Sequence, residues 1–212
     1  MDLMGIAIKY LRNDYPAAQL SVFRNLFGML PCFIALYFSR DWHTNGRTVI
    51  IKEWRLGLLR GVFVSLAQLC LYTSYFYIPF ALVATMEYTG PMMVTLLCIP
   101  LLGEKFGWFK MSAVISGFIG IVLIMQPWSS DFNIIILLPV LAAFGYSLAR
   151  VTALNFPRDV PTPLINLYAQ VGTIIVSMTL VITFNMWSNF KSFEDFIIVC
   201  LMGLAGGTGT LF

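Results

Sequence analysis

The chain has 212 residues, of which 59% are hydrophobic and 11% are charged, and its formal net charge is +3. A water-soluble domain carries about 25% charged residues, so this composition excludes an ordinary soluble protein. The sequence contains no phosphate-binding loop, dinucleotide fingerprint, paired-cysteine motif or histidine cluster. We therefore expect no cofactor, no metal site and no nucleic-acid partner.

Long apolar runs follow one another and predict transmembrane helices. About 20 apolar residues span a hydrocarbon core of about 30 Å as a helix, and runs that do not alternate exclude a barrel. Six complete spans are predicted, at residues 17–38, 56–77, 80–102, 111–125, 134–154 and 164–186. The sequence thus predicts an all-α, polytopic transmembrane bundle that contacts the lipid bilayer along its sides.

Two partial spans flank these six, at residues 1–8 and 196–212. Neither is long enough to be a complete span, and the second stops at an apolar residue without a polar cap. We expect the chain to be part of a longer protein. The alternative is a genuine short protein with frayed ends.

Lys and Arg concentrate in alternate loops. If the spans alternate in direction, nine basic residues fall on one side: Arg40, Arg47, Lys52, Arg55, Arg60, Lys105, Lys110, Arg150 and Arg158. The other side holds Lys9, Arg12 and Lys191 together with several carboxylates. The positive-inside rule predicts that the nine-residue side is cytoplasmic, in an inner or plasma membrane.

The segment ALVATMEYTGP at residues 81–91, followed by LLGEK at 101–105, resembles the end of the first repeat of an EamA-type transporter of the drug/metabolite transporter superfamily. Residues 15–25 resemble the second helix of that family, and residues 141–146 the opening helix of its second repeat. The resemblance implies ten helices in two inverted five-helix repeats. Residues 1–127 would be the first repeat, with a truncated first helix, and residues 128–212 the N-terminal part of a truncated second repeat.

A weak internal similarity agrees with such repeats. QLSVFR at residues 19–24 aligns with INLYAQ at 165–170, each near the start of a span and preceded by proline. The alignment makes Arg24 and Gln170 counterparts. Chance alignment of two short apolar strings is the alternative.

Glu87 is the first candidate for substrate binding or coupling, because a carboxylate inside the bilayer is costly. Pro91 follows one turn later and loosens the helix by removing a hydrogen bond. Interrupted helices form midplane sites in transporters. Tyr88, beside the carboxylate, is a further candidate. Alternatively, a neighbouring helix satisfies Glu87.

Arg24 lies about two turns into its span. It could pair with Glu87, bind an anionic group of the substrate, or extend to the outer surface while its stem stays in the membrane. A structural pair or an extended side chain is the preferred interpretation.

Two polar stripes occur at helical spacing, one at Ser65, Gln68, Tyr72 and Tyr75 and one at Asn166, Gln170, Thr173 and Ser177. Such stripes fit two walls of a wet cavity, to which Tyr146 on another span could add. Polar residues also join helices without any cavity. Both interpretations stand for Gln68, Tyr72 and Gln170.

Small residues and charges mark two other places. The glycine pairs Gly57/Gly61 and Gly203/Gly207 predict close helix packing or, alternatively, flexible gating helices. Glu104, after Gly103, predicts an interfacial turn beside Lys105; the family resemblance adds a cytoplasmic gate.

These features favour a secondary-active carrier of a small organic metabolite, not an enzyme, that works by alternating access. A substrate gradient, an exchanged substrate or a proton gradient would drive it. Tyrosines and amides on the candidate faces favour aromatic-bearing substrates, such as nucleoside-like or amino-acid-derived compounds. The alternatives are a non-transporting scaffold or assembly subunit, an intramembrane enzyme and a channel. A homodimer is compatible with all of them.

Overall fold

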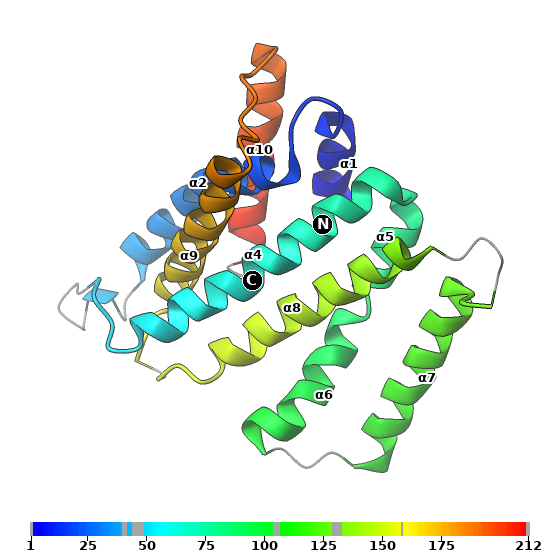
Figure 1. Ribbon diagram of the computed structural model, residues 1–212. Helices are drawn as coiled ribbons and strands as arrows, with labels where there is room; N and C mark the ends of the chain where they lie inside the picture. Colours follow the sequence, from blue (N-terminus) through cyan, green and yellow to red (C-terminus); the bar gives the residue numbers. More distant parts are fainter. Residues whose placement is uncertain are drawn as a thin grey trace.

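The computed structural model describes residues 2–39, 42–43, 49–103, 107–128, 133–157 and 159–210. All regular secondary structure in these ranges is helical (Figure 1). Six helical segments within them are long and apolar enough to cross a membrane. The predicted all-α, polytopic bundle is therefore confirmed.

The helices follow the predicted apolar runs closely. Their bounds are α1 Asp2–Leu11, α2 Ala17–Phe38, α4 Trp54–Tyr77, α5 Phe80–Glu87, α6 Gly90–Leu102, α7 Trp108–Met125, η1 Ile134–Leu137, α8 Leu138–Ala153, α9 Thr162–Thr183 and α10 Phe193–Gly209. The observed ends differ from the predicted ones by at most three residues, and both α7 and α10 begin three residues early. At α10 the reason is a cap. The Ser192 side chain caps it by accepting a hydrogen bond from the amide of Glu194.

The third span is broken into α5 and α6 by Tyr88 and Thr89. Pro91 lies in the first turn of α6, where its missing amide hydrogen costs no helical hydrogen bond. The Ser147 hydroxyl of α8 donates to the Gly90 carbonyl oxygen, 3.0 Å away, and to its own helix. The interruption that the sequence predicts therefore lies directly after Glu87. Helix α8 binds the backbone on the α6 side of this break, at Gly90.

Helices α2, α4, α8, α9 and α10 form the packed centre of the molecule (Figure 1). Helix α4 packs along both α8 and α9, whereas α2 packs along α9 and α10. Short α1 contacts α10, α4 and α5. Helix α6 packs on α8, and α7 lies outside it, with Val114 as its buried residue.

Glycines set the closest helix contacts. A Cβ atom added at Gly61 of α4 would lie 2.6 Å from the Ala169 carbonyl oxygen and 2.7 Å from the Gly172 Cα atom of α9. A Cβ atom added at Gly203 of α10 would lie 2.5 Å from the Phe27 Cβ atom of α2. Both predicted glycine pairs therefore serve close packing.

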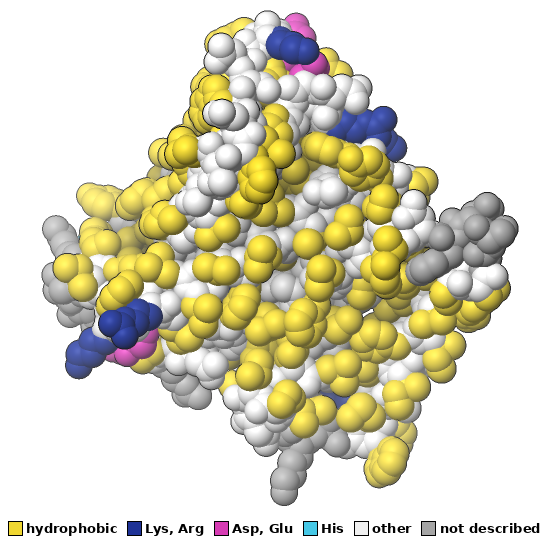
Figure 2. Space-filling model, in the orientation of Figure 1, with side chains coloured by type: hydrophobic (Ala, Val, Ile, Leu, Met, Phe, Trp, Pro, Cys, Tyr) yellow, Lys and Arg dark blue, Asp and Glu magenta, His cyan; other side chains and the backbone are white. Residues whose placement is uncertain are grey.

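Hydrophobic side chains cover most of the face in Figure 2, and the charged side chains lie mostly at its periphery. This distribution fits a protein whose sides face lipid. Several predicted interfacial residues lie outside the described ranges: Arg40, Arg47, Glu104, Lys105 and Arg158.

A hydrogen-bonded cap joins the start of α2 to the connection between α9 and α10. The Tyr15 hydroxyl donates to the Asp195 carboxylate over 2.8 Å and accepts from the Lys191 amide. The Lys191 ammonium pairs with Asp14. The Gln19 side chain exchanges two hydrogen bonds with the Ser188 backbone. The cap holds together two segments that are about 170 residues apart in the chain.

Candidate functional site

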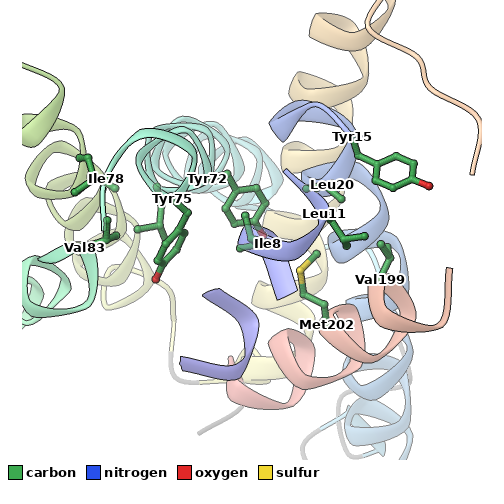
Figure 3. Close-up of a cluster of buried hydrophobic side chains, with 12 residues drawn as sticks. Ile8, Leu11, Tyr15, Leu20, Tyr72, Tyr75, Ile78, Val83, Val199 and Met202 are labelled. Carbon is green, nitrogen blue, oxygen red and sulfur yellow. The ribbon is translucent and has the colours of Figure 1, made fainter. Parts of the chain in front are cut away.

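A cluster of buried side chains lies where α1, α2, α4, α5, α8 and α10 meet (Figure 3). Tyr72 and Tyr75 of α4 are 1% and 2% exposed, and Ile8 of α1 and Val83 of α5 pack in the same cluster. The predicted polar stripe of α4 therefore faces the interior. Its two tyrosines bring hydroxyl groups into an otherwise apolar core.

Glu87, at the end of α5, reaches this cluster. The Tyr75 hydroxyl donates to its Oε2 atom over 3.2 Å. The Tyr75 ring stacks on Phe80 at 5.6 Å, and Gly5 of α1 lies against both rings, since a Cβ there would lie 2.9 Å from the Tyr75 hydroxyl. The half-buried carboxylate is thus held by α4, and α1 packs against the tyrosine that holds it.

Arg24 of α2 is 8% exposed. Its Nη1 atom donates to the Asn25 Oδ1 atom over 3.2 Å, while its Nε atom has no hydrogen-bond partner among the described residues. Gly206 of α10 makes room for the guanidinium, because a Cβ there would lie 2.8 Å from Nε. The side chain is therefore held inside the bundle and does not extend to the surface.

A buried hydrogen-bond network that includes Arg24 and Asn25 connects α2 to α4 and α9. The Asn25 amide and the Ser21 hydroxyl of α2 both donate to the Gln68 Oε1 atom of α4, at 2.8 and 2.7 Å. Ser177 of α9 lies 3.0 Å from Ser21 and 3.2 Å from Ser65 of α4 (hydroxyl oxygens). The second stripe therefore faces the interior as predicted, and its hydroxyl groups join helices.

The polar face of α4 connects the surroundings of Arg24 with Glu87. Gln68 accepts a hydrogen bond from Asn25, which in turn accepts one from Arg24, and Tyr75, two turns along α4, donates to Glu87. Tyr146 of α8 packs against the same cluster as Tyr72 and Tyr75. The structure thus brings six predicted residues into one neighbourhood: Arg24, Gln68, Tyr72, Tyr75, Glu87 and Tyr146.

The other three candidates lie apart from it. Gln170 of α9 donates to the Gly28 carbonyl oxygen at 3.3 Å and to the Cys32 sulfur, which joins α9 to α2. Tyr88 is 72% exposed, and Pro91 is exposed at the start of α6. No described contact connects these three residues to the tyrosines of the cluster.

Sequence reasoning identified Arg24 but missed the other network residues of α2, Ser21 and Asn25. Ser21, Arg24, Asn25 and Gly28 recur at steps of three, one and three, which places them on one face of a helix. That polar and small-residue spacing was the available signal. Gly206 gave no such signal, because its role depends on a contact with Arg24, and α10 lies far from α2 in the sequence.

Two open apolar grooves lie away from this region. One, of about 470 Å³, runs between α6 and α7 beside Val114. The other, of about 620 Å³, lies among α6, η1 and α8. Their walls are hydrophobic and hold none of the nine candidates. Such surfaces suit contact with acyl chains or other apolar helices better than recognition of a polar solute.

Residues 3–126, more than half of the chain, match the EamA-like transporter family. The chain is 24% identical over 210 residues to an S-adenosylmethionine uptake transporter of Rickettsia conorii, covering 96% of this chain and 65% of that protein. A protein with the same description from Rickettsia prowazekii is 23% identical over 209 residues, with 95% and 65% covered. The chain thus spans about 65% of the length of these curated relatives.

A shorter match has higher identity. A riboflavin transporter of Vibrio cholerae is 42% identical over 59 residues, which cover 28% of this chain and 20% of that protein. No solved structure matches the chain significantly.

Proposed function

We propose that this chain, which belongs to the EamA-like transporter family, acts in a secondary-active carrier that moves a small organic metabolite across a membrane by alternating access. The family match over residues 3–126 is the observation that carries the proposal. The buried polar region supports it: charges and unpaired polar groups inside a membrane bundle are costly and typical of transport pathways. The substrate would bind between Arg24 and Glu87, against Tyr72 and Tyr146.

The substrate class follows from the relatives and from the lining of this region. The similar proteins are described as transporters of S-adenosylmethionine and of riboflavin, and both of these metabolites contain a flat heteroaromatic system. Aromatic rings stack on such systems and hydroxyl groups orient them. We therefore propose an aromatic-bearing metabolite, either nucleoside-like or derived from an amino acid.

We also propose that residues 1–127 and 128–212 belong to two related repeats. If α2 of the first repeat corresponds to α9 of the second, and α4 to α10, then the packing of α2 on α10 corresponds to the packing of α9 on α4. The glycine contacts agree with this correspondence: Gly28 of α2 contacts Gly203 and Gly207 of α10, and Gly172 of α9 contacts Gly61 of α4. This register makes Tyr168 the counterpart of Arg24, two residues from the Gln170 of the sequence alignment.

The energy source and the orientation complete the proposal. Glu87 could take up a proton during the cycle, so proton coupling or exchange of one substrate for another would drive transport. The basic loops would face the cytoplasm of a cell with an inner or plasma membrane. A homodimer is compatible with this arrangement.

The test is uptake into proteoliposomes that hold the product of the native gene, beside vesicles with the 212-residue chain and empty vesicles. Radiolabelled S-adenosylmethionine and riboflavin, and a mixed metabolite pool, are offered with and without a pH gradient. Accumulation of one class above the empty vesicles is expected. A folded protein that accumulates none of them would contradict the proposal and favour the scaffold, in which the buried hydrogen bonds only join helices.

A further inference from the structure

Two buried donors beside Asn25, the Arg24 Nε atom and the Gln68 Nε2 atom, have no acceptor among the described residues, and neither has the Tyr72 hydroxyl, one turn along α4 from Gln68. Gln68 and Tyr72 are 0% and 1% exposed, and Arg24 is 8% exposed. Buried polar groups in native proteins are nearly always paired, so each exception requires an explanation. Three groups that can all donate a hydrogen bond, so close together on α2 and α4, call for one common explanation.

The three donors belong to one local arrangement. Asn25 receives a hydrogen bond from Arg24 and donates one to Gln68, so both flanking residues are attached to the same amide. Gln68 and Tyr72 are four residues apart on α4 and therefore lie on one face.

The protein leaves the positive charge of this arrangement uncompensated. Among the described residues, no carboxylate lies within 4 Å of the guanidinium, since the single ion pair found there joins Lys191 to Asp14. Glu87 instead accepts a hydrogen bond from Tyr75. A buried charge without a partner is strongly unfavourable, and a neutral amide such as Asn25 compensates it only in part.

The two side-chain amide oxygens beside these donors are already in use: the Asn25 Oδ1 atom accepts from Arg24. The Gln68 Oε1 atom accepts from both Ser21 and Asn25, which leaves the Nε2 donor to point elsewhere. What remains is a set of donors with a net positive charge. A group that satisfies such a set must be rich in acceptors and negatively charged, and guanidinium groups bind carboxylates and phosphates in this way.

We propose that Arg24, Gln68 and Tyr72 form a subsite for an anionic group of the transported substrate, a carboxylate or an equivalent oxyanion. This inference rests on the proposed function, because it assigns a role within the same substrate region. The aromatic part of the substrate then lies toward Tyr146 and Glu87. The subsite would select acidic or zwitterionic metabolites over neutral and purely cationic ones of the same shape.

The test uses pairs of probes that differ in one anionic group: S-adenosylmethionine and its decarboxylated form, flavin mononucleotide and riboflavin, tryptophan and tryptamine. Binding to the purified native gene product is measured by equilibrium dialysis with labelled probes. In at least one pair, the anionic member is expected to bind at least about tenfold more tightly, since each hydrogen bond to a charged group is typically worth that factor or more. Equal affinities within every pair would overturn the subsite.

Two variants and one control test whether tighter binding of the anionic probe depends on Arg24 and Tyr72. Arg24→Gln should abolish it. Tyr72→Phe should reduce it several-fold without loss of thermal stability, because the hydroxyl has no partner to lose. Arg60→Gln is the control: it removes a guanidinium that is bound to the Ala149 carbonyl and to Asn166, and it should keep the preference. A preference that survives both Arg24→Gln and Tyr72→Phe would also overturn the proposal.

The uptake assay separates this inference from the proposed function. If the vesicles accumulate a metabolite while the probe pairs show no preference for the anion, the carrier stands and the subsite falls. If the vesicles accumulate nothing and the protein binds no probe, both fall together.

Discussion

The hydrogen bond from Tyr75 to Glu87 ties the carboxylate at the helix break to α4. We predict that Glu87→Gln lowers uptake at least about tenfold and flattens its pH dependence. The amide cannot release a proton, and it loses an interaction with a charged group that contributes about 1.5–3 kcal/mol. Initial uptake rates in proteoliposomes between pH 5 and pH 8 measure both effects.

Tyr75→Phe is the matched control for this prediction. It removes the donor but keeps the carboxylate and the ring that stacks on Phe80. Uptake should fall less than in Glu87→Gln, and its pH dependence should remain. If Glu87→Gln leaves uptake and its pH profile unchanged, Glu87 has a structural role only.

Tyr15 governs the stability of the hydrogen-bonded cap at high pH. Burial is the main cause that raises the pKa of its hydroxyl above the ordinary 10.0, and Asp195 adds to it. Asp14 likewise raises the pKa of Lys191 above 10.5. A group whose pKa is raised by folding contributes stability that is complete below its unfolded-state pKa and is lost as the pH rises through the folded-state value.

The melting temperature in detergent should therefore stay level up to about pH 10 and decline above it, to the extent that these two groups control it. Tyr15→Phe should be less stable at neutral pH by about 1–3 kcal/mol, since Asp195 is left buried without this donor. Its stability should decline less steeply above pH 10. An unchanged alkaline slope in the variant would show that other groups control the transition.

At the scale of the helices, the order and length of the spans were predictable because a bilayer imposes a fixed length on each apolar run. The break after Glu87 was predictable as well, since Pro91 cannot donate a hydrogen bond inside a helix. The partners of α2 were not predictable. Arg24 meets Gly206, about 180 residues away, and no local pattern encodes which helices pack together.

The close contact of α4 with α9 leads to a prediction about stability. Gly61→Ala should destabilise the protein by about 1–3 kcal/mol, because the added methyl group would meet the Ala169 and Gly172 backbone, which cannot rotate away. Gly120→Ala in α7 is the matched control, since nothing lies within 4 Å of a Cβ at that position. It should be neutral or stabilising by up to about 1 kcal/mol through helix propensity.

Thermal unfolding in detergent compares the two variants with the unaltered chain. Equal melting temperatures for Gly61→Ala and Gly120→Ala would mean that α4 and α9 are not in close contact. That result would also remove the glycine contacts from the argument for two related repeats.

At the scale of the whole molecule, the distribution of charges predicts the orientation. Lys52 lies on the side with more basic residues and Lys191 on the other, and both are exposed. In a cysteine-free background, Lys191→Cys should react with a membrane-impermeant maleimide added outside intact cells. Lys52→Cys should react only after the cells are opened. The reverse pattern would invert the assignment.

Helix α7 differs from the rest of the bundle in what holds it in place. Val114 is its buried residue, Gly117 contacts Met92, and most of its other residues are exposed. Its position then depends on partition into lipid more than on fitted contacts. In a library of all single substitutions, α7 should accept almost any exchange among apolar residues, whereas α2 and α4 should reject most of them. The pattern of tolerated substitutions would then distinguish the helices whose positions are fixed by contacts with other helices from α7, whose position is fixed by the surrounding lipid.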